Sequence, residues 1–190
     1  ILDIGGSEIY WKILTNEFLT DKNVHITILN MPSKVPLPDN NQVFSFVTGD
    51  GCDLSCFNDN EFDISHSNSV LEHVGNESRV KCFVSESKRV GKTCYLQTPN
   101  FWFPVEPHFL IPFFQFLPLY IRARLLTIFN LGQFDRIRSF DKAYVLVRSI
   151  KLLTARNLHE LFPKAAFFRE EFLFMTKSFM IIDKQPLMRR

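Results

Sequence analysis

The sequence predicts an α/β domain built on a mostly parallel β-sheet with helices on both faces. Short apolar runs rich in β-branched residues recur between Ile1 and Pro99, and a helical pattern or a loop separates each run from the next. Glycine or proline residues stand at the ends of several runs, where a chain turns. Strands that alternate with helices in this way are typical of a parallel sheet.

The first predicted unit is a strand, a turn and a helix. Ile1–Gly5 is a short apolar run that ends in glycine, as expected of a buried parallel strand followed by a tight turn. Ser7 and Glu8 then open Ile9–Leu19, a segment whose apolar residues have helical spacing. These features predict one helix directly after the first turn.

Four more strands are predicted before Pro99. They are His25–Leu29, Gln42–Val47, Phe62–Ser67 and Cys94–Thr98. The segments between them are predicted to be a proline-containing loop at Met31–Asn41, a turn at Gly49–Gly51, and helices at Ser69–His73 and Glu77–Val90.

The character of the chain changes after Pro99. Phe101–Ile121 combines many aromatic residues with several prolines, and Leu119–Leu131 has the pattern of an amphipathic helix. We predict that residues 101–150 form an insertion that caps the active site. Peripheral membrane contact through residues 101–131, or a dimer surface, is the alternative. The predicted elements that complete the domain are a helix at Leu153–Leu161 with Thr154 as its N-cap, and strands at Ala166–Phe172 and Phe174–Ile182.

Length and composition indicate a single globular domain. The 190 residues are 46% hydrophobic and 22% charged, which excludes a disordered or collagen-like chain. Lysine plus arginine number 22 against 20 aspartates plus glutamates, so the net charge gives no reason to expect a nucleic-acid partner. Several of the basic residues gather late in the chain, among them Arg122, Arg124 and the terminal Arg189-Arg190. The oligomeric state cannot be predicted from these features.

The cysteines and the first residues of the chain indicate the cellular compartment. Cys52, Cys56, Cys82 and Cys94 form no C-x-x-C pair and lack histidines at zinc-ligand spacing, so we expect free thiols and no metal site. The start of the chain has no basic-then-apolar signal segment, and we therefore expect a cytoplasmic protein, free or peripheral at a membrane. The chain opens at Ile1 directly in a predicted strand, which suggests that part of the domain precedes it.

The loop at Asp3–Ser7 is the first candidate binding site. Ligands of open parallel sheets bind beyond the carboxyl ends of the strands, and the first strand-turn-helix unit offers backbone N–H groups there. Glycines at such a turn allow positive φ angles and close approach of a ligand to the backbone. An ordinary tight turn is the alternative interpretation.

Five motifs occur in a recognisable order along the chain. They are Ile1-Leu2-Asp3-Ile4-Gly5-Gly6-Ser7, Ile26-Thr27-Ile28-Leu29-Asn30, Gly49-Asp50-Gly51-Cys52-Asp53-Leu54, Phe62-Asp63 through Leu71-Glu72-His73-Val74, and Arg89-Val90-Gly91-Lys92 before Thr98-Pro99-Asn100. This order resembles the class I S-adenosylmethionine-dependent methyltransferase family, and in particular its type 11 methyltransferase domain. The resemblance implies a Rossmann-like seven-stranded sheet whose last strand is antiparallel, and S-adenosylmethionine as the cofactor.

The resemblance also implies roles for individual residues. Asp3, Gly5, Gly6 and Ser7 would face the methionine moiety of the cofactor, and Asn30 would face the ribose hydroxyls. Asp50, Gly51 and Cys52 would face adenine, and Ser67 and Asn68 would border the methionyl group. Two simpler roles remain open, since Asp50 could fix a turn and Asn68 could cap a helix.

The chain departs from the family pattern at two places. The family loop is usually D-x-G-x-G-x-G, whereas Ser7 and Ile9 occupy the second and third glycine positions here. A serine tolerates the bend if its φ stays negative, and isoleucine implies a less intimate approach of the cofactor. Asn30 stands where the family usually has an acidic residue, so a hydrogen bond to the ribose would lose its charge-assisted strength.

Candidate catalytic residues are His73, Glu106 and His108. Methyl transfer from a sulfonium is an in-line displacement that positioning and a dry pocket accelerate, so no fixed triad is required. A general base is needed only when the acceptor is a hydroxyl or a protonated amine, and these three residue types can serve. Structural hydrogen bonding is the alternative role for each of them.

Two functions from different classes follow. The first is a methyltransferase that acts on an unidentified small molecule, sugar or lipid. The second is a non-catalytic methyltransferase-like module, associated with a membrane or a partner subunit, which the altered glycine loop and the aromatic segment would favour. A nicotinamide-dependent oxidoreductase ranks third, because the G-x-G-x-x-G fingerprint is absent and no acidic residue ends the second strand.

Overall fold

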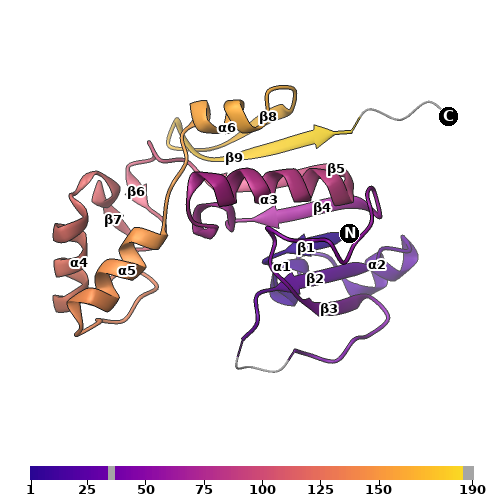
Figure 1. The fold of residues 1–190 in the computed structure, drawn as a ribbon, viewed down its shortest axis with the longest axis horizontal. Coiled ribbons are helices and arrows are strands. Elements are labelled where there is room, and N and C mark those ends of the chain that lie inside the picture. Colours follow the sequence, from indigo (N-terminus) through magenta and orange to yellow (C-terminus); the bar gives the residue numbers. More distant parts are fainter. Residues whose placement is uncertain (34–36, 186–190) are drawn as a thin grey trace.

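The computed structural model describes residues 1–33 and 37–185, and its centre is a seven-stranded sheet of order β3-β2-β1-β4-β5-β9-β8 (Figure 1). The strands are β1 (Leu2–Ile4), β2 (Ile26–Asn30), β3 (Phe44–Thr48), β4 (Phe62–Asn68), β5 (Gly91–Pro99), β8 (Ala166–Phe172) and β9 (Met175–Lys184). β1 to β5 pair in parallel, and β9 is antiparallel to both β5 and β8. The predicted mostly parallel seven-stranded sheet with an antiparallel last strand is thus confirmed. Residues 34–36 of the predicted loop, and Arg189-Arg190, lie outside the described residues.

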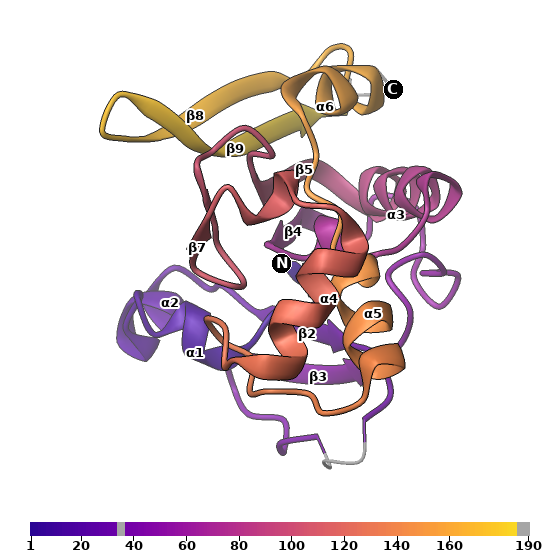
Figure 2. The ribbon, with the colours of Figure 1, turned by 90° about the vertical axis from the view of Figure 1, so that its left-hand side faces the viewer.

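Helices cover both faces of this sheet. Figure 2 shows α1 (Glu8–Trp11) and α2 (Asn16–Asp21) on one side, and α3 (Glu77–Val90) and α6 (Ala155–Leu161) on the other. The bounds predicted for α3 are the observed ones, and Thr154 caps α6 by accepting a hydrogen bond from the Asn157 backbone N–H, as predicted. Two separate apolar clusters result, one between the sheet and α3 with α6, the other between α1, α2 and β2.

The single helix predicted at Ile9–Leu19 is wrong, because two short helices occupy this segment. The Thr15 side chain accepts a hydrogen bond from the Phe18 backbone N–H and starts a second helix there. The apolar spacing on which the prediction rested also misled, since Ile9 is 75% and Ile13 is 83% exposed. Trp11 and Leu19 are the residues of the two helices that are buried.

The strand that follows α3 begins without a turn. Gly91 is both the C-cap of α3 and the first residue of β5, whereas the prediction began this strand at Cys94. A Cβ atom at Gly91 would lie 2.6 Å from the Ser65 backbone nitrogen on the neighbouring strand. Glycine is therefore required here because the backbones of β4 and β5 approach too closely for a side chain.

Asp3 ties α1 to the sheet. Its buried carboxylate accepts a hydrogen bond from the Trp11 indole nitrogen at 2.7 Å, and its other oxygen lies 2.7 Å from Nδ1 of His66 on β4. Because α1 has only four residues, it depends on tertiary contacts, and this bond adds to the apolar packing of Trp11 in holding the helix on the sheet.

Replacing Trp11 with phenylalanine should lower the free energy of unfolding by about 1 to 3 kcal/mol, because it leaves a buried carboxylate oxygen without its donor. Urea unfolding followed by far-UV circular dichroism measures the change. Trp102→Phe is the matched control, since Trp102 is exposed and its replacement should cost no more than about 0.5 kcal/mol. Equal losses in the two variants would contradict this role of Trp11.

Residues 101–150, called the cap from here on, form a separate lobe. The cap contains β6 (Val105–Glu106), β7 (Ile111–Pro112), the 3-10 helix η2 (Phe114–Phe116), α4 (Leu119–Ile128) and α5 (Phe140–Ser149). It has an apolar core of its own, built from the residues Phe109, Phe114, Leu126 and Val147 among others. In Figures 1 and 2 the cap stands at the end of the sheet toward which β4 points.

Two details of the cap differ from the sequence prediction. α4 ends at Ile128 rather than Leu131, and α5 was missed although Ser139 caps it and Ala143 and Val147 give it a buried face. Among the described residues, no helix has the length and apolarity needed to cross a membrane.

Candidate functional site

A cavity of about 620 Å³ lies where β1, β2 and β3 end. It is called the cofactor cavity after the role that the family resemblance implies for several of its residues. Its walls come from the loops after these three strands and from the segment between β4 and α3. The lining residues include Gly5, Asn30, Asp50, Gly51, Cys52, Val70, His73 and Arg79. The structure thus brings together residues from four of the five sequence motifs.

The glycine loop forms part of this cavity through Gly5. Gly5 has a φ of +77°, and a Cβ atom there would lie 2.6 Å from Cγ2 of Val70. Gly6 has no room for a side chain either, since its Cβ would overlap the Asp3 carboxylate. These two glycines let the backbone border the cavity and pack on Asp3.

The two departures from the family loop cause no crowding. Ser7 is the N-cap of α1 with a φ of −145°, so the negative φ required of a serine is present. Ile9, at the third glycine position, points to solvent. Its side chain therefore does not reduce the space for a ligand.

Asp3 and Ser67 are turned away from the cofactor cavity. Both carboxylate oxygens of Asp3 are engaged by Trp11 and His66, and the Ser67 hydroxyl donates to the Ile4 carbonyl oxygen at 3.1 Å. A second, smaller cavity of about 280 Å³ is lined by Asn68 together with Asp3, Gly5, Gly6, Ser7, Tyr10 and His66. Gly5 belongs to both cavities, so they meet at the glycine loop.

Asn30 and Asp50 also line the cofactor cavity. The Asn30 amide nitrogen donates to the Gly6 carbonyl oxygen at 2.9 Å, which ties the end of β2 to the glycine loop. Asp50 accepts hydrogen bonds from the Cys52 backbone N–H at 2.9 Å and from Arg79 at 2.9 and 3.1 Å. The Cys52 bond and the Arg79 guanidinium lower the pKa of Asp50, which favours its charged form.

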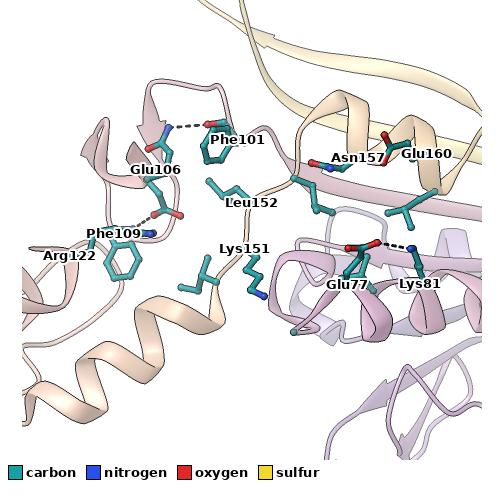
Figure 3. Close-up of a pocket in the computed structure, with 16 residues that line it drawn as sticks. Glu77, Lys81, Phe101, Glu106, Phe109, Arg122, Lys151, Leu152, Asn157 and Glu160 are labelled. Atoms are coloured by element: carbon teal, nitrogen blue, oxygen red, sulfur yellow. Dashed lines mark hydrogen bonds and ion pairs between the residues drawn. The ribbon is translucent and has the colours of Figure 1, made fainter. Parts of the chain in front are cut away.

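A further cavity of about 640 Å³, called the cap cavity, lies between the cap and the helices α3 and α6. Its apolar walls include Phe101, Phe109 and Leu152, and its polar lining includes Glu106, Gln115 and Arg122 from the cap. Figure 3 shows Glu106 and Arg122 on the cap side, and Glu77, Lys81 and Asn157 on the side of α3 and α6. The sequence-predicted cap therefore borders a pocket.

The three candidate catalytic residues form one hydrogen-bonded chain. Glu106 accepts from Nδ1 of His108 at 2.7 Å, and Nε2 of His108 lies 3.0 Å from Nε2 of His73. The other Glu106 oxygen accepts from the backbone N–H groups of His108 and Phe109, both at 2.8 Å. Since Glu106 lines the cap cavity and His73 lines the cofactor cavity, the chain runs from one cavity to the other.

Glu72 lies beside this chain and is fully buried. Its Oε2 accepts from the Thr98 hydroxyl at 3.0 Å, and its Oε1, 3.8 Å from Nε2 of His108, has no hydrogen-bond partner among the described residues. Burial raises the pKa of Glu72. The His73 side chain is exposed, but the surrounding protein partly desolvates its ring, which lowers the pKa of His73; the neighbouring His108 adds to this effect, so the neutral form is favoured.

Four residues of the site were missed by sequence reasoning. Glu72 stands in the motif Leu71-Glu72-His73-Val74, where an acidic residue next to a histidine was a usable signal. Arg79, Gln115 and Arg122 gave no such signal, because each reaches its cavity only through the placement of a helix or of the cap.

Comparisons with known proteins agree with this architecture. Residues 12–93 match the family model of a methyltransferase domain, and the match begins after the Asp3–Ser7 loop. A search of curated proteins gave no significant match.

Solved structures of methyltransferases have the same fold. A SAM-dependent methyltransferase from Methanosarcina mazei is 17% identical with a TM-score of 0.53, over 97% of this chain and 91% of that one. A SAM-dependent methyltransferase from Archaeoglobus fulgidus is 12% identical with a TM-score of 0.55, over 97% and 85% of the two chains. An O-methyltransferase family protein from Burkholderia thailandensis is 9% identical with a TM-score of 0.54, over 97% and 50%. The chain therefore has the fold of the class I S-adenosylmethionine-dependent methyltransferases and, over residues 12–93, the sequence pattern of a methyltransferase domain.

Proposed function

We propose that this chain binds S-adenosylmethionine in the cofactor cavity and transfers its methyl group to an acceptor held in the cap cavity. The observation that carries the proposal is the chain of His73, His108 and Glu106, which joins the two cavities. A group-transfer enzyme needs its two substrates on either side of one reacting point, with polar groups at that point. The acceptor is proposed to be a small molecule, sugar or lipid.

The walls of the cofactor cavity suit this cofactor. Gly5 lets the backbone border the cavity where the methionine moiety would lie. Gly51 lets the chain pack closely on Phe83 near the adenine position, where a Cβ would lie 2.6 Å from that ring. Asp50 offers a carboxylate that Arg79 holds in place, suited to an amino group such as that of adenine. Asn30 lies at the end of β2, where the ribose would pass.

The cap cavity suggests the chemical class of the acceptor. Nε of Arg122 and Oε1 of Gln115 are buried there without a partner among the described residues. A buried donor and a buried acceptor without partners are costly, and a ligand that satisfies both would gain affinity. Together with the apolar walls, these groups favour an acceptor that has an apolar body and an anionic or carbonyl group facing Arg122.

The bound cofactor supplies a methyl group on a positively charged sulfur, and the protein positions the acceptor for in-line attack. Because Nδ1 of His108 donates its proton to Glu106, Nε2 of His108 carries the lone pair. We therefore assign Nε2 of His73 as the proton donor in the hydrogen bond between the two imidazoles. Nδ1 of His73 is then available to take a proton from a hydroxyl or amine of the acceptor.

Incubation with methyl-labelled S-adenosylmethionine and a fractionated extract tests this function. We expect label to appear in a small-molecule, sugar or lipid fraction, which mass spectrometry then identifies. The same incubation with heat-denatured protein is the control. Labelling that is no greater than in this control, or that is confined to protein, would contradict the proposal.

Asp50→Ala should weaken cofactor binding by about 1 to 3 kcal/mol, because it removes a charge-assisted hydrogen-bond acceptor from the adenine wall. Calorimetric titration with S-adenosylhomocysteine measures the loss. Asp53→Ala is the matched control, since Asp53 is exposed and does not line the cofactor cavity. A loss of the same size in both variants would show that the turn, and not the Asp50 carboxylate, matters.

A further inference from the structure

Three side chains converge at the junction of the two cavities. One carboxylate oxygen of Glu72 and one ring nitrogen each of His73 and His108 all lie within 4.8 Å of one another. We propose that Glu72, His73 and His108 bind a divalent transition-metal ion. Two imidazoles and one carboxylate are a ligand set typical of such ions, whereas magnesium and calcium prefer ligand sets made of oxygen atoms alone.

Glu72 is the strongest indication of an ion. Its Oε1 is fully buried and has no hydrogen-bond partner among the described residues, while the Thr98 hydroxyl holds its Oε2 at 3.0 Å. Leaving a buried carboxylate oxygen unpaired costs free energy that a cation would recover. Thr98 fixes the carboxylate so that the unpaired oxygen points toward His108, which lies 3.8 Å away.

His108 is oriented as metal-binding histidines are. Its Nδ1 is held at 2.7 Å by Glu106, which is itself fixed by two backbone N–H groups. Hydrogen bonding of one ring nitrogen to a carboxylate sets the tautomer and leaves the lone pair of the other nitrogen for the metal. Glu106 is thus a positioning residue for the proposed ion, and it does not contact the ion.

His73 completes the set and keeps the site open. Its Nε2 lies 3.0 Å from Nε2 of His108, and its ring borders the cofactor cavity. Ligand atoms at 2.0 to 2.2 Å from one ion are roughly 3 to 3.5 Å apart at ordinary coordination angles, and the two distances from His108, 3.0 and 3.8 Å, lie close to this range. All three ligand atoms lie within 4.8 Å of one another, so the exposed His73 ring would move toward Glu72 when the ion binds. Ion binding would replace the hydrogen bond between the two imidazoles, and the remaining positions of the ion would be free for substrate.

An ion at this place would deepen the proposed function, on which the following step rests. It would bind an oxygen of the acceptor and take over the role assigned above to the His73 imidazole. The acceptor hydroxyl would release its proton to water, its oxygen would bond to the methyl carbon, and the carbon–sulfur bond of the cofactor would break. The products are a methyl ether and S-adenosylhomocysteine, so the acceptor is inferred to be a hydroxyl compound.

Binding of Mn²⁺ without cofactor or acceptor tests the site. Mn²⁺ is the probe because thiolates favour softer ions, and the four cysteines are free thiols. Electron paramagnetic resonance measures the unbound ion during a titration of the chain. We expect saturable binding of one ion, weakened at least about tenfold in Glu72→Gln and in His73→Ala, since each loses one ligand.

Both variants should keep the fold, for different reasons. His73 is exposed, and Glu72→Gln retains an oxygen for Thr98, so both should fold, which circular dichroism verifies. His159→Ala removes an exposed histidine elsewhere and should bind Mn²⁺ as the unaltered chain does. Absence of saturable binding, or equal binding in the variants, would overturn the metal site. If a chain that does not bind Mn²⁺ still binds S-adenosylhomocysteine, the metal site is wrong and the proposed function stands. If the chain binds Mn²⁺ but not S-adenosylhomocysteine, the proposed function is wrong and the metal site stands.

Discussion

Gly5→Val should lower the affinity for S-adenosylhomocysteine at least about 100-fold, or roughly 2.7 kcal/mol. The valine would sit at a φ of +77°, which β-branched residues avoid, and its Cβ would lie 2.6 Å from Cγ2 of Val70. Either the side chain enters the cofactor cavity or the loop moves away from the ligand. Calorimetric titration measures the affinity.

Gly75→Ala is the matched control for backbone strain. Gly75 also has a positive φ, +119°, but the nearest atom to its Cβ is Cδ of Arg79, at 3.5 Å. It should lose stability without a comparable loss of cofactor affinity. Gly5→Ala provides a milder second variant if the valine prevents folding. Unchanged binding in Gly5→Val would show that the glycine loop does not contact the cofactor.

Glu106→Gln should reduce methyl transfer about 100-fold while leaving S-adenosylhomocysteine binding unchanged. The glutamine has only one acceptor oxygen for the three hydrogen bonds that Glu106 accepts, so His108 loses its orientation. The initial rate of label transfer to the acceptor fraction, with circular dichroism to verify folding, measures the effect.

Glu171→Gln is the control for this prediction. Glu171 is exposed on β8 and lines neither the cap cavity nor the cofactor cavity. Its replacement should change the rate little. If Glu106→Gln transferred methyl groups as fast as Glu171→Gln, the chain that joins the cavities would have no part in the reaction.

The alternation of strands and helices could be predicted from the sequence, because the buried strands of a parallel sheet appear as short apolar runs separated by helices or loops. Glu77–Val90 was predicted to the residue because its apolar positions, its acidic first turn and its basic last turn all agree. The Ile9–Leu19 prediction failed because periodicity does not reveal which face a short segment buries. The break at Thr15 depends on a single cap that competes with helix continuation.

The site could be predicted only as far as local motifs carry it. Gly5, Asn30 and Asp50 line one cavity together with His73, because the ends of parallel strands converge at one edge of the sheet, and the roles predicted for them stay predictions. The chain from His73 to Glu106 joins residues 33 positions apart in sequence, and its geometry depends on how the cap folds back. Asp3 shows that a motif position can also have a structural role, because its carboxylate forms hydrogen bonds with Trp11 and His66.

Calorimetric titration of the chain with S-adenosylhomocysteine tests the cofactor assignment most directly. The proposed function predicts saturable one-to-one binding that Gly5→Val removes and Asp53→Ala retains. No binding by the folded chain at about 1 mM ligand, where even a weak site is half filled, would contradict it.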